Sequence, residues 1–90
     1  MAAFNYLRRV LESLVRQAEM GIGIKTPKPK MKDRVQELVK KEALNSLLLE
    51  PGFNVLYTIL SKGVHELNES ECQAQYPLLQ EAIDTILEDK

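Results

Sequence analysis

Two side chains in this sequence could do thiol chemistry together, His65 and Cys72, which lie seven residues apart. On one continuous helix that spacing would place both side chains on the same face. A histidine beside a cysteine can hold the thiol as a reactive thiolate. The stretch from Asn68 to Ser70 is instead typical of a helix break, and nothing nearby supplies an orienting third group. We therefore expect no catalytic site, and a thiol-active or ligand-binding helical bundle is the second alternative function.

Metal and nucleotide sites lack their usual sequence patterns. One histidine, one cysteine and scattered carboxylates do not give the paired ligand spacing that holds zinc. Residues 21–25 contain two glycines, but this segment follows a predicted helix rather than a strand. It also lacks both nucleotide-binding fingerprints. We expect neither a metal nor a cofactor.

Charge divides the sequence into a basic half and an acidic half. Residues 1–45 hold ten Lys and Arg against five Asp and Glu, whereas residues 46–90 hold two Lys against eight Asp and Glu. The field of such an uneven distribution acts on whatever approaches the protein. Most of the positive excess lies in one short run. Its candidate partner-binding residues are Lys25, Lys28, Lys30, Lys32 and Arg34.

An acidic protein surface and nucleic acid would both be attracted by this basic run. Nucleic acid is the alternative function, and it is disfavoured. No aromatic residue that could stack on bases occurs between Tyr6 and Phe53, and the run holds a single Arg. The acidic half would also repel a phosphate backbone. We therefore expect a small non-enzymatic protein-interaction module, such as a regulator, adaptor, chaperone or inhibitor.

Apolar spacing predicts helices along almost the whole chain. The first helix covers about 3–20, and its apolar stripe consists of Phe4, Leu7, Leu11, Leu14 and Ala18. The opposite, exposed face carries Arg8, Glu12, Arg16 and Glu19. Gly21 is expected to end this helix in the left-handed conformation that favours glycine.

An extended Pro/Lys-rich arm is expected at residues 21–32, because Pro27 and Pro29 exclude helix there. Asp33, with Gln36 three residues on, predicts the N-cap of a second helix over about 33–49.

Pro51 predicts the first residue of a third helix, over about 51–67. A fourth helix, over about 70–88, is capped either by Asn68 with Glu71 or by Ser70 with Gln73. This fourth helix is either kinked at Pro77 or starts there.

These elements predict an all-α fold, a small antiparallel bundle of three to four helices in a single domain, 1–90. We expect a homodimer, because opposite charges can pair between copies and the first apolar stripe is also a coiled-coil seam. The stripe residues Phe4, Leu7, Leu11 and Leu14 are therefore further candidates for partner binding. In an alternative arrangement, a three-helix body donates its first helix to a partner chain.

The chain contains no apolar run close to the roughly 20 residues that cross a bilayer, so no transmembrane segment is expected. A lone Cys72 cannot form an internal disulfide. We therefore expect a cytoplasmic protein.

Overall fold

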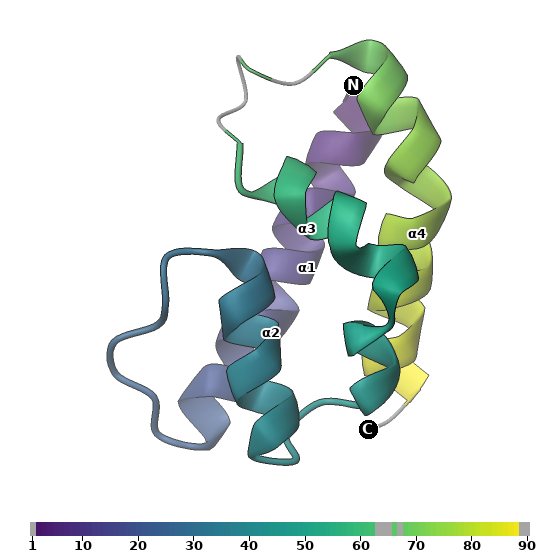
Figure 1. Ribbon diagram of the computed structural model, residues 1–90. Coiled ribbons are helices and arrows are strands. Elements are labelled where there is room, and N and C mark those ends of the chain that lie inside the picture. The colour runs from purple at the N-terminus through teal and green to yellow at the C-terminus, as the bar shows by residue number, and fades with distance from the viewer. Residues whose placement is uncertain (1, 63–65, 67, 89–90) are drawn as a thin grey trace.

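The computed structural model describes residues 2–62, 66 and 68–88 (Figure 1). Four α-helices and no strand occur in these residues, with short 3-10 helices between the second and third. The elements are α1 (Ala2–Gly21), α2 (Met31–Lys40), η1 (Ser46–Leu49), η2 (Pro51–Phe53), α3 (Asn54–Leu60) and α4 (Glu69–Glu88). The predicted all-α fold class is confirmed.

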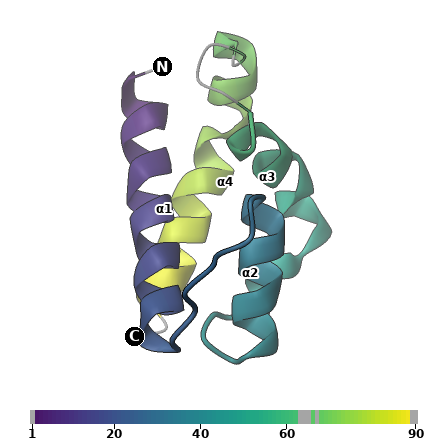
Figure 2. The same ribbon diagram turned by 90° about the vertical axis from the view of Figure 1, so that its left-hand side faces the viewer.

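α1 and α4 form a pair that runs in the same direction, with α2 and α3 on one side of it (Figures 1 and 2). Near the helix starts, Phe4 lines the same hollow as Cys72, and further along Ala18 lines another with Ile86. The predicted antiparallel arrangement therefore does not hold for this pair. The physical reason is the loop of residues 22–30, which returns along the molecule before α2 begins, whereas a short turn would produce antiparallel neighbours (Figure 2).

One apolar cluster joins all four helices. Its largest fully buried side chains are Leu11, Val15, Val35, Leu38, Leu48, Leu56 and Leu79. Each buried aliphatic side chain contributes about 1.5–3 kcal/mol, so this cluster, rather than surface charge pairs, holds the helices together. Since α1 supplies part of the cluster, the first helix packs within its own chain in this structure.

Arg8 and Glu19, both predicted on the exposed face of the first helix, make inward contacts instead. Nη2 of Arg8 donates to the carbonyl oxygens of Leu60 and Lys62, at 3.1 and 3.0 Å. These carbonyls lie at the last residue of α3 and two residues beyond it, where the helix supplies no further backbone donors. Arg8 therefore attaches α1 to α3, and the prediction of an exposed Arg8–Glu19 face is wrong at its two ends.

The end of α1 is capped by Gly23 rather than by Gly21. Gly21 is still helical, and Gly23 has the positive φ, 80°. The N–H of Ile24 donates to the carbonyl of Glu19, and the N–H of Gly23 donates to that of Met20. This pair of bonds is a Schellman motif, in which a left-handed residue closes the helix end. The prediction for Gly21 is therefore wrong by two positions.

α2 begins two residues earlier than predicted. Lys30 takes the N-cap position, with extended backbone and no side-chain hydrogen bond to the helix. Asp33 lies in the first turn instead, where its negative charge favours the positive end of the helix dipole. The predicted N-cap role of Asp33 with Gln36 is therefore wrong.

α2 ends at Lys40, not near residue 49. Glu42 adopts a left-handed φ of 61°, and the N–H of Ala43 donates back to the carbonyl of Leu38. This is a second Schellman motif, closed by a residue other than glycine. The chain then continues into η1, whose start is capped by the side chain of Asn45.

The predicted third helix is divided into η2 and α3. Pro51 starts η2, while the α-helix itself is confined to Asn54–Leu60. The hydroxyl of Tyr57 donates to the carbonyl of Leu48, which attaches α3 to η1, and Phe53 stacks on the Tyr57 ring. Several residues of the predicted range lie outside the described part of the chain, namely Gly63, Val64, His65 and Leu67.

α4 starts where Asn68 caps it. Oδ1 of Asn68 accepts a hydrogen bond from the N–H of Glu71 at 2.7 Å, and Nδ2 donates to the Glu71 carboxylate at 3.0 Å. This confirms the first of the two capping alternatives. The helix is continuous through Pro77, so the alternative in which it starts at that proline is wrong.

Candidate functional site

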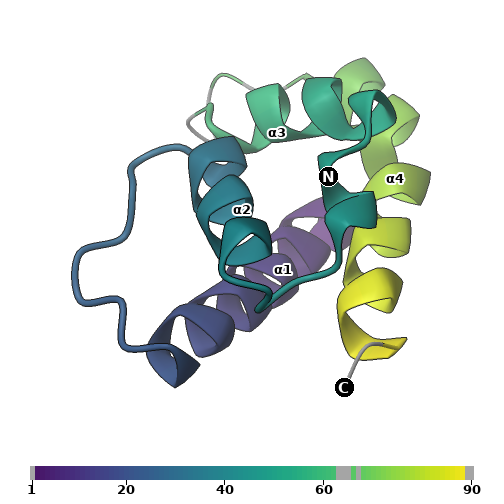
Figure 3. The same ribbon diagram turned by 60° about the horizontal axis from the view of Figure 1, so that its bottom comes forward.

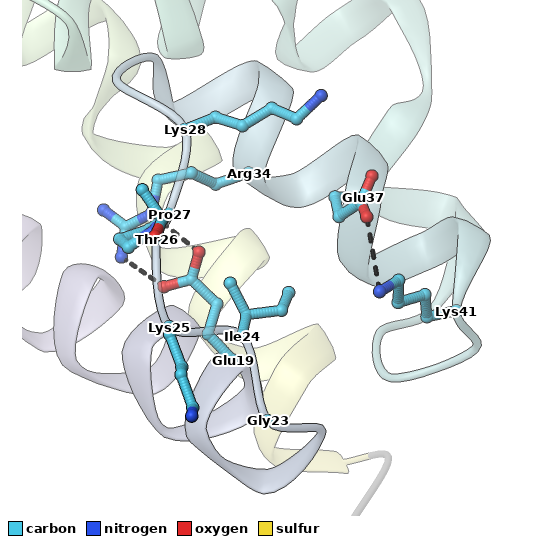
Figure 4. Close-up of a pocket in the computed structure, with 10 residues that line it drawn as sticks. All are labelled: Glu19, Gly23, Ile24, Lys25, Thr26, Pro27, Lys28, Arg34, Glu37 and Lys41. Carbon is cyan, nitrogen blue, oxygen red and sulfur yellow. Dashed lines mark hydrogen bonds and ion pairs between the residues drawn. The ribbon is translucent and has the colours of Figure 1, made fainter.

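A buried ion pair fixes the base of the loop of residues 22–30. Nη2 of Arg34, on α2, lies 2.6 Å from Oε1 of Glu19, on α1, and Nε lies 3.1 Å from Oε2 (Figure 4). Glu19 is 3% exposed. The hydrogen bond to Glu19 raises the pKa of Arg34, against the opposing effect of burial. Two parallel bonds of this kind set the orientation of both groups, so the loop leaves α1 and enters α2 from fixed positions.

A hollow of about 360 Å³ lies between this loop and α2 (Figure 4). Two of its cationic groups are already neutralised, because Arg34 pairs with Glu19 and Lys41 lies 3.5 Å from Glu37. The ammonium groups of Lys25 and Lys28 point away from each other in Figure 4. Tight anion binding needs donors that converge on one point, so the hollow does not have the geometry of an enclosed phosphate or carboxylate site.

The predicted basic residues belong to two groups. Four of them are exposed and form no ion pair with any residue in the described part of the chain. These are Lys25, Lys28, Lys30 and Lys32, which we call the lysine loop. Arg34 differs, because its guanidinium is committed to Glu19 and is not available to a partner. The structure therefore keeps four of the five predicted basic residues on one exposed segment.

The predicted apolar candidates lie elsewhere. Phe4, Leu11 and Leu14 are buried in the core of their own chain, and Leu7 packs against that core. A side chain already buried in this way cannot also form the seam of a coiled coil with another chain. The stripe and the lysine loop are therefore not one surface.

The thiol and metal alternatives gain no support from the described residues. Cys72 is buried, between the starts of α1 and α4, and His65 lies outside the described residues. Among residues 2–62, 66 and 68–88, no group of three His, Cys, Asp or Glu side chains could hold a metal ion. No helix in these same ranges is long and apolar enough to span a membrane.

Sequence reasoning missed the role of Glu19. The residue borders the apolar stripe, directly after Ala18, but nothing in one sequence links it with Arg34, fifteen positions later. It also missed that α1 and α4 both carry exposed charges, and that these charges differ in sign. Arg9 and Arg16 are exposed on α1, whereas Glu81, Asp84 and Glu88 are exposed on α4. The signal for that face was the seven-residue spacing of the two arginines.

No protein-family model, curated protein or solved structure matches this chain. The function proposed below therefore rests on the residues and their arrangement.

Proposed function

We propose that this protein is a non-enzymatic protein-interaction module that binds an acidic surface of a partner protein through its lysine loop. One observation carries the proposal. Lys25, Lys28, Lys30 and Lys32 are exposed without a carboxylate partner among the described residues, on a segment whose base is fixed by the Glu19–Arg34 pair. Unpaired charges of one sign on one segment steer and orient a partner of the opposite sign.

The restricted backbone of the loop favours binding. Pro27 and Pro29 fix their own φ angles, and the Schellman motif at Gly23 closes the end of α1. A segment that is already restrained loses less conformational entropy when a partner orders it. The lysines can therefore contribute more of their interaction energy to affinity than lysines on an unrestrained tail would.

A protein partner is favoured over nucleic acid by what surrounds the lysines. No aromatic ring accompanies them in the sequence, and the single arginine of the run is held by Glu19. Single-stranded nucleic acid is commonly bound through aromatic stacking, and bases are most often read by arginine. Neither group is present on the lysine loop.

The proposal includes self-association as a homodimer, since charge of both signs is exposed on one small chain. It also includes a cytoplasmic location, on the argument that the single cysteine builds no internal disulfide.

The test measures binding of a fluorescent polyglutamate peptide by anisotropy at low and high salt, with labelled DNA and RNA of equal length in parallel. The variant K28Q/K30Q/K32Q should weaken peptide binding about tenfold, because each exposed ion pair contributes about 0.2–1 kcal/mol. The control K40Q/K41Q removes two exposed lysine charges of α2 that lie outside the lysine loop, and it should bind as the wild type does.

Equal losses in the two variants would mean that net charge alone attracts the peptide, and the proposal would fail. Tighter binding of DNA or RNA than of the peptide, lost in K28Q/K30Q/K32Q, would assign the lysine loop to nucleic acid instead.

A further inference from the structure

One side of the α1–α4 pair is not covered by any described element. α2 and α3 both pack on the other side (Figure 2). We call the uncovered side the back face. Tyr6, Arg9 and Arg16 recur on α1 at helical spacing, opposite the buried Leu11 and Val15, and all three are exposed. On α4, Pro77, Glu81, Asp84 and Glu88 are exposed.

The α1 part of the back face is hollowed and partly apolar. A hollow of about 380 Å³ is lined by Tyr6, Arg9, Val10, Ser13 and Leu14. Tyr6 is 62% exposed, although its ring is one of the largest apolar groups in the chain. An exposed apolar hollow rimmed by charge is typical of a surface that another protein covers.

The two helices of the back face carry opposite charges. Arg9 and Arg16 lie on α1, and Glu81, Asp84 and Glu88 lie on α4. All five are exposed, and none forms an ion pair with another described residue. The two arginines are seven residues apart, as are the two glutamates, and seven residues advance a helix by about 10.5 Å. The charges of one helix therefore match those of the other in spacing as well as in sign.

The levels of the two helices determine which residues would meet. Phe4 lines one hollow with Cys72, and Ala18 lines another with Ile86. Both pairs are 68 positions apart, which sets the approximate relative level of the two helices. By the same offset, Arg9 is level with Pro77 and Arg16 with Asp84.

A two-fold axis parallel to the helices would preserve these levels, because it places α1 of one copy over α4 of the other without shifting either along its length. Pro77 then lies over the hollow beside Tyr6, and Arg16 lies over Asp84 with Glu88 one turn on. By the same offset Glu81 lies one turn beyond Arg9, and the symmetry repeats all of these contacts. Each arginine of one copy therefore has an acidic residue of the other copy level with it or one turn away.

We propose that two copies of this chain form a closed, two-fold dimer through their back faces, with α1 of each copy packed along α4 of the other. This deepens the self-association included in the proposed function and leaves both lysine loops outside the interface.

The expected dimer is a weak one. Two helices of 20 residues present a face about 30 Å long and about 20 Å wide, or roughly 600 Å² per copy. Stable dimers commonly bury about 800 Å² per copy, so dissociation in the micromolar range is expected.

Sedimentation velocity on the full chain at low salt tests this arrangement. Mass should rise with concentration from 10.3 kDa to twice that value and no further. R9E/R16E and E81R/E88R should each raise the dissociation constant at least about tenfold, because each variant places like charges within one helical turn of each other across the interface. An equimolar mixture of these two variants should restore a dimer, because each reversed helix then meets its complement.

The control K28E/K30E makes the same charge change as R9E/R16E on the lysine loop and should leave the dimer unchanged. Helix content by circular dichroism should be equal in all four proteins. A wild type that remains monomeric up to about 1 mM, growth beyond two copies, or a mixture that stays monomeric would each overturn the dimer.

Polyglutamate binding, measured on the same samples, separates the two proposals. A monomer that still binds the peptide removes the dimer alone. A dimer that does not bind the peptide removes the lysine loop alone.

Discussion

At the scale of single residues, Glu19 determines what the basic run can offer to a partner. Its buried carboxylate takes Arg34 out of the exposed set, and the four lysines that remain have no such neighbour. A guanidinium can hold a carboxylate through two parallel bonds, whereas an ammonium acts as a point charge. The protein thus uses its bidentate group for structure and presents the point charges at its surface.

Replacing Glu19 should destabilise the protein far more than replacing another glutamate of α1. Glu19→Ala leaves the largely buried Arg34 guanidinium without its carboxylate, which should lower the free energy of unfolding by about 2–4 kcal/mol. Glu12→Ala removes only the exposed partner of Arg8 and should cost under about 0.5 kcal/mol. Urea unfolding measures both free energies. Equal losses of stability in the two variants would show that the buried pair stabilises the protein no more than the exposed pair does.

The buried phenol of Tyr57 should make stability depend on alkaline pH. Burial raises the pKa of Tyr57 above its ordinary value near 10, so the unfolded chain loses this proton at a lower pH than the folded protein does. Stability is therefore fully present below pH 10 and falls above it, by up to about 1.4 kcal/mol per pH unit.

Tyr57→Phe isolates this effect. Because the variant lacks the hydrogen bond to the Leu48 carbonyl, its free energy of unfolding should be about 1 kcal/mol lower than that of the wild type at neutral pH. This difference in stability should shrink above pH 10. Urea unfolding across pH 7–11 measures it. A difference that stays constant with pH would contradict a phenol protected by burial.

At the scale of elements, the helix ends decide where the surfaces lie. The Schellman motif at Gly23 directs the chain into the lysine loop, and the one at Glu42 stops α2 before the predicted residue 49. The cap at Asn68 starts α4 level with the start of α1. The helix end at Gly23 therefore positions the lysine loop, and the cap at Asn68 positions α4 beside α1.

Two glycines of one helix end should respond oppositely to alanine. Gly23→Ala should cost about 1 kcal/mol, because φ is positive there and alanine disfavours that conformation, although a Cβ would meet no atom. Gly21→Ala should stabilise by up to about 1 kcal/mol, because alanine is the better helix former. Thermal unfolding of both variants checks the pair, and a stabilising Gly23→Ala would contradict the motif.

At the scale of the whole molecule, the charge division of the sequence becomes a division in space. The loop of residues 22–30 and the helix α4 lie on opposite sides of the molecule (Figure 3). The positive end is the lysine loop, and the negative end includes Glu81, Asp84 and Glu88. Exposed charges separated by more than a Debye length, about 8 Å in physiological salt, are largely screened from each other. The lysine loop and the acidic residues of α4 therefore do not neutralise each other within one chain. They remain available to partners.

The sequence by itself determined the helical fold, the residues of the core and the cap at Asn68, because these depend on local spacing. The stripe of Leu11 and Leu14 has a helical period whatever it packs against, and Asn68 reaches its partner within one turn. The exposure of Lys25, Lys28 and Lys30 was predictable for the same reason, since prolines keep their segment out of the helices, whereas Lys32 lies in the first turn of α2.

Only the tertiary structure decided how those pieces meet. Nothing local requires Glu42 to adopt a left-handed φ, Glu19 to find Arg34, or α4 to run in the same direction as α1. These choices depend on the free energy of packing residues far apart in the chain, which no short window of sequence contains. The back face results from this long-range packing, because Arg16 and Asp84 come to the same level only when α1 and α4 pack side by side.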